Sequence, residues 1–238
     1  MLVHGWPLSG ALLGEAGHRP AGRGLPESSR ADRRGFGQSS KPATGYDYDT
    51  FAADLDKLMT KLDLHEATLV GFDGRGEVAR FLSKYGSKRV AKAVFMAAIP
   101  PFLLKRADNP SGLEGSVFKG IQQAIAADRP AFLSTFFRAF LQRRRPGRKA
   151  HQRSSRPIQL ERCSRRSAKG TLDCVSAWLT DFRQDLRAST CRRWSFTAMP
   201  TEFFHRCYGK PLRNAIGRPD SSSWRVGRTA SPGRTRSR

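Results

Sequence analysis

The sequence lacks long apolar runs. None of its 238 residues belongs to a stretch that approaches the roughly 20 consecutive apolar residues a membrane-spanning helix needs. The first residues also lack the basic segment followed by an apolar segment that is typical of a secretory signal peptide. We therefore expect a cytoplasmic protein with no membrane partner, long enough to form one α/β domain with a sizeable core.

Patterns that bind metals are lacking as well. The chain has four cysteines, none of them in a C-x-x-C pair, and its five histidines do not cluster with them. Structural zinc sites need closely spaced ligand pairs. We therefore expect no metal site, and we interpret the cysteines as free thiols: Cys163, Cys174, Cys191 and Cys207.

Acidic residues are scarce in one half only. The net charge is +23, and residues 141–238 hold 24 Lys and Arg against 6 Asp and Glu, whereas residues 1–140 hold 19 against 14. We expect an α/β core over residues 1–140, with cap helices beginning near residue 103. Residues 141–238 are then a degraded, basic and poorly ordered C-terminal part of the same domain.

The basic half allows a second interpretation, a polyanion-binding protein that acts through residues 141–238. Clustered arginines neutralise phosphates and bind nucleic acids electrostatically. No recognition helix, zinc finger or RNA-binding aromatic motif accompanies them in the sequence. We therefore expect nucleic-acid binding to be only non-specific.

Hydrophobic periodicity predicts alternating helices and strands. Residues 49–63 form an amphipathic helix with Asp49 or Thr50 as N-cap. The apolar runs 67–72 and 90–98 have strand length, and a helix over 77–85 separates them. This order predicts βαβ units and a parallel sheet covered on both faces. The apolar side chains expected to face inward on the first helix are Phe51, Leu55, Leu58 and Leu62.

Two further helical patterns lie in residues 111–141. Val117, Ile121 and Ile125 form one apolar stripe, and a second stripe is made of phenylalanines. Core packing is the plainer interpretation. The alternative is a helical cap whose aromatic side chains line a substrate pocket.

Residues 67–86 combine a buried strand, a tight glycine-rich turn and an amphipathic helix, which is the framework of a nucleophile elbow. In a G-x-S-x-G elbow, the turn lifts a serine Oγ above the sheet, beside backbone N–H groups that can hold an oxyanion. Residues 71–76 contain no serine, and Asp73 stands at the tip of the turn.

Several segments together resemble the non-haem haloperoxidases (chloroperoxidases), which are serine-esterase-like members of the α/β-hydrolase superfamily. These segments are His4 to Gly10, Asp32 to Pro42, Gly45 to about Phe140, and Lys169 to about Leu186. The resemblance implies an α/β-hydrolase fold with a mostly parallel central sheet, flanking helices and a helical cap. It also leads us to expect that the N-terminal strands of that fold are missing and that the C-terminal part is irregular.

The resemblance further implies a Ser-Asp-His triad and an oxyanion hole. The two backbone donors fall on Trp6 and Gly74 in this chain. Such enzymes hydrolyse esters and convert a carboxylic acid with peroxide into a peracid, which oxidises halide without haem or metal. The resemblance therefore implies no cofactor. The implied partners are therefore a small ester, or a carboxylic acid plus peroxide. His4 lies in the oxyanion-loop motif, where we expect a structural hydrogen-bonding role and not that of a base.

The chain lacks all three triad residues in the contexts that the family leads us to expect. Asp73 replaces the serine in an elbow one residue shorter, and neither the Val-Ile-His-Gly-Asp-Ala-Asp segment nor the Gly-Pro-His-Gly turn is present. We predict negligible hydrolase activity from the chain as written. An alternative is a dehalogenase-like enzyme in which Asp73 is the nucleophile and forms an ester intermediate, but no histidine is placed to activate water.

Small frame errors in the coding sequence explain the three departures together. Serine, methionine and glycine codons written tcg-atg-ggc contain gat-ggg, or Asp-Gly, one base out of phase. With suitable codons, Trp194 to Thr201 shifts to Val-Ile-His-Gly-Asp-Ala-Asp, and Arg228 to Gly233 shifts to Pro-His-Gly. GC-rich DNA read out of frame also yields Arg, Ser, Pro and Gly. The hypothesis therefore explains the basic C-terminal half without a polyanion.

Overall fold

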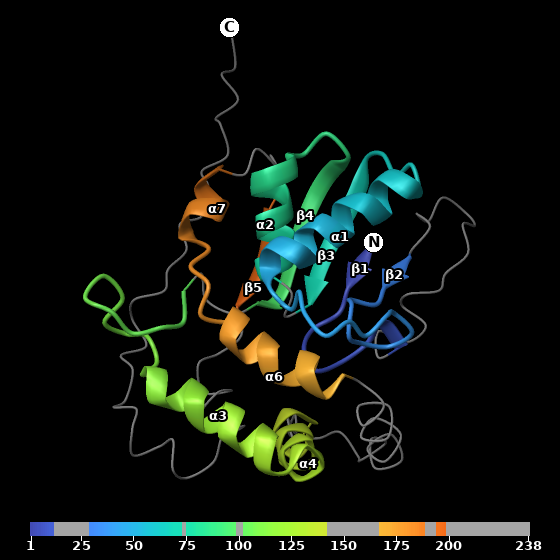
Figure 1. Cartoon of the computed structure of the whole chain (residues 1–238). Coiled ribbons are helices and arrows are strands. Elements are labelled where there is room, and N and C mark those ends of the chain that lie inside the picture. The colour runs from blue at the N-terminus through green and yellow to red at the C-terminus, as the bar shows by residue number, and fades with distance from the viewer. Residues whose placement is uncertain (12–28, 73–74, 99–101, 142–166, 189–193, 199–238) are drawn as a thin grey trace, which may run out of the picture.

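The computed structural model describes residues 1–11, 29–72, 75–98, 102–141, 167–188 and 194–198. Within these ranges five parallel strands form one sheet in the order β2-β1-β3-β4-β5 (Figure 1). The strands are β1 (Leu2–Val3), β2 (Arg30–Ala31), β3 (Ala67–Phe72), β4 (Val90–Ala98) and β5 (Trp194–Ala198). The helices are α1 (Tyr48–Lys61), α2 (Arg75–Tyr85), α3 (Gly115–Ala127), α4 (Arg129–Leu141), α6 (Ala168–Ala177) and α7 (Arg183–Ala188).

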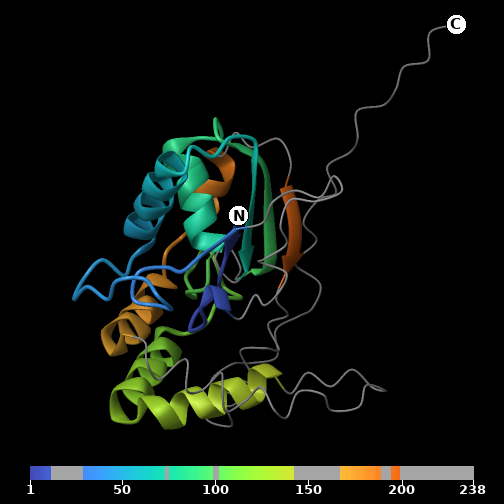
Figure 2. The same cartoon turned by 90° about the vertical axis from the view of Figure 1, so that its right-hand side faces the viewer.

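The helices form two groups around the sheet. Helices α1, α2 and α7 lie on one face of it, as the edge-on view in Figure 2 shows. Helices α3, α4 and α6 lie beyond the ends toward which the arrows of β3 and β4 point, which are the carboxyl ends (Figures 1 and 2). The parallel sheet with flanking helices confirms the α/β architecture that the alternation of helix and strand predicts. The described helices cover one face (Figure 2), so the predicted cover of the second face stays a prediction.

The predicted strands over 67–72 and 90–98 are confirmed, and α2 begins two residues earlier than the predicted helix over 77–85. The predicted cap of α1 is wrong. Asp47 is the N-cap, because its extended backbone lets the carboxylate accept hydrogen bonds from the Thr50 N–H and from the Thr50 hydroxyl, both at 2.8 Å.

The buried face of α1 also differs in part from its prediction. Phe51 and Leu55 are buried as expected, but Leu62 is 52% exposed. The buried stripe continues through Ala52 and Met59, because Leu62 is the C-cap and lies past the last turn that contacts the sheet. Burial predicted from helical spacing is therefore least reliable for the residue that ends the helix.

Two apolar clusters form the core of the described residues. One packs α1 and α2 against the sheet and includes Met59, Leu69, Phe81 and Phe95. The other joins the loops after β1 and β2 to α3, α4 and α6, and includes Trp6, Phe36, Leu133 and Trp178. Its stripe of Val117, Ile121 and Ile125 is buried as predicted.

Ser167, the N-cap of α6, makes hydrogen bonds to residues of the segment between β2 and α1. Ser167 donates its backbone N–H to the Gly35 carbonyl at 3.1 Å, and Tyr46 donates its hydroxyl to Ser167 Oγ at 3.1 Å. The expected division at residue 141 stays a prediction, and residues 142–166 and 199–238 lie outside the described residues. No helix of the described part is long and apolar enough to cross a membrane.

Leu133 tests whether the second cluster belongs to the cooperative core. It is 1% exposed, so Leu133→Ala is expected to lower the free energy of unfolding by about 2–5 kcal/mol, because the lost contacts leave a cavity. Leu62→Ala is the matched control and should change stability by less than about 0.5 kcal/mol, since the side chain is largely exposed. Urea unfolding measures both, and equal effects would contradict the packing described here.

Candidate functional site

The strand order predicts one crevice at the carboxyl edge of the sheet. The chain runs from β1 outward to β2 and then crosses back to β3 on the other side of β1. Loops diverge at such a switch point and leave a crevice that binds ligands in open α/β sheets. Val3 is aligned with Gly71, so the loop after β1 and the turn after β3 leave the sheet side by side. These are the predicted oxyanion loop and the predicted elbow.

Trp6 is described, and its side chain is locked in place. The residue is 3% exposed, and its indole Nε1–H donates to the Thr171 carbonyl at 3.1 Å. The ring packs edge-on against Trp178 with centroids 4.7 Å apart, and against Phe136 at 5.3 Å. Within the described part of the chain, the backbone N–H of Trp6 makes no hydrogen bond. It is therefore a free donor on a fixed loop.

The tip of the elbow, Asp73 and Gly74, lies outside the described residues. The structure does describe the strand that leads into the turn and the helix that leaves it. At the second residue of α2, Gly76, an added Cβ would collide with the Phe182 ring and lie 2.5 Å from Tyr48 Cε1. The helix start is thus packed against aromatic rings at a distance that only glycine permits.

His4 has a structural role, as expected. Its Nε2 lies 3.0 Å from the Arg33 backbone N–H, which donates to it, and its Nδ1 lies 3.0 Å from the Gly5 carbonyl. This pattern fixes a neutral ring with the proton on Nδ1. The ring is 1% exposed, so it cannot reach a substrate as a base.

A buried ion pair joins the oxyanion loop to α2. Arg33 donates from Nη2 to the His4 carbonyl at 2.6 Å, and its Nε lies 3.4 Å from Glu77 Oε2. Both side chains are 5% exposed. Within the described residues, the Nε and Oε2 atoms make no hydrogen bond. Burial raises the pKa of Glu77 to about 7, which the positive charge of Arg33 only partly opposes.

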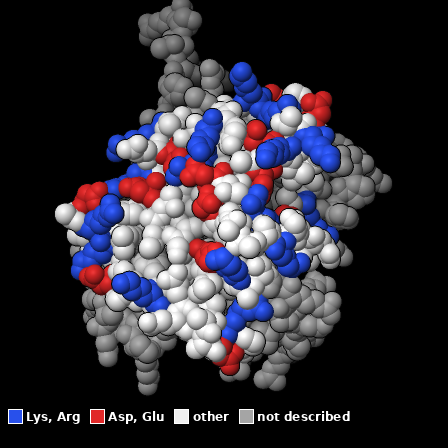
Figure 3. All heavy atoms as spheres, viewed as in Figure 1, with Lys and Arg blue, Asp and Glu red and all other residues white. Residues whose placement is uncertain are grey.

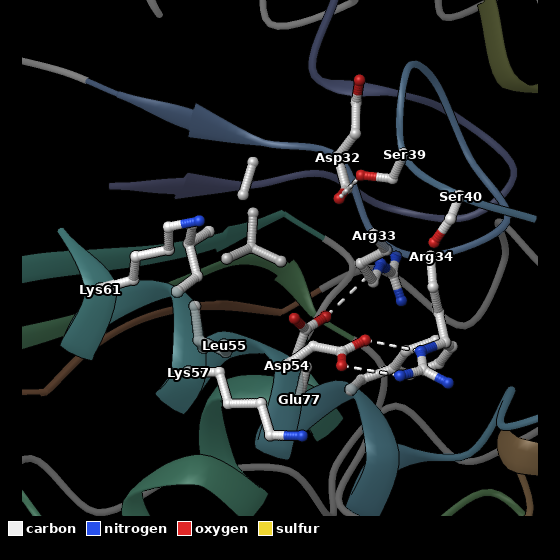
Figure 4. A pocket seen from close by; sticks show the side chains of 14 residues that line it. Asp32, Arg33, Arg34, Ser39, Ser40, Asp54, Leu55, Lys57, Lys61 and Glu77 are labelled. Atoms are coloured by element: carbon white, nitrogen blue, oxygen red, sulfur yellow. Dashed lines mark hydrogen bonds and ion pairs between the residues drawn. The ribbon is translucent and has the colours of Figure 1, made fainter.

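Arg33 and Glu77 line a cavity of about 360 Å³ between β2 and α1. Figure 4 shows Arg33 directed at Glu77, and Arg34 directed at Asp54 in a second pair along the same wall. Trp6 is not among the residues that line this cavity. The cavity therefore lies beside the predicted catalytic crevice and is not that crevice.

The charged side chains of the described part are mixed in sign. On the face shown in Figure 3, Lys and Arg are interspersed with Asp and Glu, so this face offers no single basic patch. No group of three or more His, Cys, Asp and Glu suited to a metal occurs among the described residues. Cys174 is buried, which raises the pKa of its thiol to about 12 and suppresses the reactive thiolate.

Sequence reasoning missed Arg33 and Glu77 as residues of the site. A signal was present for Glu77, because it falls one position before Val78 on the buried side of a predicted amphipathic helix. Arg33 carries no such signal, because the sequence predicts no strand directly before it. The partner of Glu77 cannot be predicted either, because the pair joins residues 44 positions apart.

The sequence and structure match known proteins over most of the chain. A family model described as alpha/beta hydrolase fold matches residues 1–205. A protein described as a putative non-heme chloroperoxidase from Synechocystis is 53% identical over 199 residues, which are 78% of this chain and 67% of that protein. The crystal structure of a bromoperoxidase from Bacillus anthracis superposes with a TM-score of 0.66 at 40% identity, over 81% of this chain and 70% of that one.

A third relative carries a description of two activities. The bifunctional esterase/perhydrolase of Acinetobacter calcoaceticus is 34% identical over 137 residues, or 54% of this chain. The match spans 47% of that relative, and therefore about half of its length.

The close contact at Gly76 generates a test of the elbow scaffold. Gly76→Ala is expected to destabilise the protein by about 1–3 kcal/mol, because the added methyl group overpacks against Tyr48 and Phe182. Gly120→Ala, in the exposed middle of α3 with nothing within 4 Å of the new Cβ, should instead stabilise by roughly 0.5–1 kcal/mol. Thermal unfolding of both variants checks the opposite signs, and a stabilised Gly76→Ala would refute the packing.

The raised pKa of Glu77 predicts a specific pH dependence of stability. The ordinary pKa is 4.5 and the folded value is about 7, so folding favours the protonated acid. The stability that Glu77 contributes is then fully present below pH 4.5 and is lost as the pH rises to about 7. Glu77→Gln should remove this pH-dependent loss of unfolding free energy, which is on the order of 3 kcal/mol.

Asp49→Asn provides a control, because the contribution of Asp49 to stability depends on pH in the opposite direction. A hydrogen bond from Lys84 lowers the pKa of Asp49, so its contribution is present above the ordinary pKa and lost as the pH falls. Urea unfolding as a function of pH follows both variants. If the difference between the unsubstituted chain and Glu77→Gln stayed constant across this range, the raised pKa of Glu77 would be wrong.

Proposed function

We propose a function for this chain from one premise: it belongs to the α/β-hydrolase fold family, as a hydrolase of the non-heme chloroperoxidase and esterase type. The scaffold is that of an acyl-transfer enzyme. Its reactions are hydrolysis of a small ester, and perhydrolysis of a carboxylic acid by peroxide to a peracid that oxidises halide. We further propose that the chain as written performs neither reaction at a useful rate.

The observation that carries the proposed reaction class is the free backbone N–H of Trp6 at the switch point of the sheet. Acyl transfer proceeds through a tetrahedral oxyanion, which needs fixed N–H donors beside the nucleophile. The Trp6 indole is held by Thr171 and by aromatic rings, so the donor does not need to reorganise during the reaction. In our proposal Gly74 supplies the second donor.

The missing triad supports the proposed loss of rate. Residues 71–76 contain no serine, and the two histidines of the described part, His4 and His65, are engaged elsewhere. His65 is exposed and pairs with Asp63 at 2.9 Å. In a serine hydrolase, loss of the nucleophile or the base lowers kcat by roughly 10⁶-fold. The donors of an oxyanion hole alone retain only a small part of the catalysis.

Nothing in the described residues favours the two alternatives. An Asp73 nucleophile still needs a histidine to activate water, and neither described histidine lies free to do so. Polyanion binding through residues 141–238 rests on a segment of which only 167–188 and 194–198 are described. Both alternatives are therefore kept as outcomes of the test.

The test compares the chain as written with the chain that corrected coding DNA specifies. The DNA is resequenced over codons 10–31, 71–77, 142–168 and 188–238, and both proteins are assayed for ester hydrolysis and for peroxide-dependent bromination with acetate. The written chain should show at most the small residual rate that an oxyanion hole without a triad supports. A chain with restored Ser, Asp and His segments should be faster by at least roughly 10³-fold.

Three results would change the proposal. Ester hydrolysis by the written chain that survives Asp73→Asn would contradict the claim that it is inactive. Dehalogenation that Asp73→Asn abolishes would establish the aspartate nucleophile instead. The third result is that resequencing confirms the written sequence and the inactive chain binds DNA in a salt-dependent way. That result would favour the polyanion-binding interpretation.

A further inference from the structure

We propose that Arg33 is a positioning residue that fixes the Trp6 loop against the first turn of α2, with Glu77 as its partner. This inference rests on the proposed function, because the loop position matters for a reaction only if Trp6 is an oxyanion donor. Arg33 does not touch the predicted crevice itself. It acts through His4, two residues before Trp6, and through the helix that follows the elbow.

Arg33 holds His4 at two points. Its backbone N–H donates to His4 Nε2 at 3.0 Å, and its side-chain Nη2 donates to the His4 carbonyl at 2.6 Å. The first bond fixes the ring, and the second fixes the peptide plane that leads into Gly5 and Trp6. Both the direction of the loop and the rotation of its first peptide are thus set by one residue on the neighbouring strand end.

The same guanidinium reaches the elbow helix. Its Nε lies 3.4 Å from Glu77 Oε2, and Glu77 is the third residue of α2, the helix that follows the predicted elbow. The guanidinium carbon lies 5.9 Å from the Phe36 ring centroid and 5.3 Å from the Phe51 ring centroid. The aromatic rings and the burial prevent the side chain from swinging out to water.

This function requires an arginine and not only a positive charge. A guanidinium carries several donors in one rigid plane, so it can bind the His4 carbonyl and face Glu77 at once. Lysine offers a single ammonium on a flexible stem, which cannot hold both positions. The orphaned Nε and Oε2 atoms show that the pair is not optimised as a hydrogen bond, which fits a role in placement.

Arg34 and Asp54 form a matched control beside this pair. Arg34 donates from Nε and Nη2 to the two Asp54 oxygens at 2.5 and 2.7 Å, also between the loop after β2 and a helix. The two side chains are 24% and 37% exposed, and the hydrogen bonds of this pair within the described residues involve neither His4 nor α2. Breaking this pair therefore removes an arginine–carboxylate contact without releasing the Trp6 loop.

Hydrogen exchange at one amide reports the loop directly. The Leu8 N–H donates to the Gly5 carbonyl at 2.9 Å and so closes the turn that contains Trp6. Its exchange is measured by NMR on the full chain, with the exchange of buried strand amides in β3 and β4 as the reference for global unfolding. Arg33→Met and Arg33→Lys should each speed Leu8 exchange by about tenfold or more relative to that reference.

The control and the milder variant complete the test. Arg34→Met should leave Leu8 exchange within about twofold of the unsubstituted chain, once global stability is taken into account. Glu77→Gln keeps the shape of the side chain and should speed exchange of the Leu8 N–H by a smaller factor than Arg33→Met. The proposal is overturned if Arg33→Met leaves Leu8 exchange unchanged, if Arg34→Met has the same effect, or if Arg33→Lys fully preserves the loop.

Kinetics separate this proposal from the proposed function. Exchange needs no nucleophile, so it tests the position of the loop in the chain as written. In the chain with a restored triad, Arg33→Lys should lower kcat with little change in KM, and Arg34→Met should change neither. A restored chain with no activity would refute the proposed function, whereas normal kcat in Arg33→Lys would refute the positioning role.

Discussion

The docking of the Trp6 indole is the interaction on which the rest of the structure depends. The ring lies at the carboxyl edge of the sheet, yet its Nε1–H is bound to α6, and it makes T-shaped contacts with Phe136 of α4 and with Trp178. The sheet and the cap helices therefore share one buried side chain. The same residue presents its backbone N–H at the switch point, so the packing that joins the two layers also orients the donor.

Two kinds of force hold the site, and they differ in cost. The aromatic contacts of Trp6 gain from burial and need no counter-charge. The Arg33–Glu77 pair is expensive, because two ions leave water and the attraction between them only partly compensates. A pair of this kind adds little net stability, whereas losing one partner leaves the other charge buried alone. Its geometric precision, and not its energy, is the property that a catalytic scaffold can use.

Sequence reasoning succeeds here where the information is local. The strand Ala67–Phe72, the helix that ends at Tyr85 and the strand Val90–Ala98 follow from apolar runs and periodicity, and the structure confirms them. The turn at Asp73 and Gly74 lies outside the described residues and stays a prediction. Sequence reasoning fails at boundaries that one hydrogen bond decides, as at Asp47, and at residues whose role depends on a distant partner, as at Arg33. The free Trp6 N–H depends on strand register, which periodicity does not supply; the family resemblance pointed to it instead.

The contacts of α6 bear on the proposed frame errors. Gly170 lies where an added Cβ would be 2.7 Å from Tyr46 Cε1, Ser167 caps the helix by accepting from the Gly170 N–H, and Thr171 presents its carbonyl to Trp6. A segment translated in a wrong frame would place unrelated side chains at these positions. On the frame hypothesis, the correct frame is therefore restored by Ser167 and maintained through α6. A frame error after residue 141 must then be followed by a compensating frame error before Ser167. Correcting the DNA between these two sites changes the residues before Ser167 and leaves the docking of α6 intact.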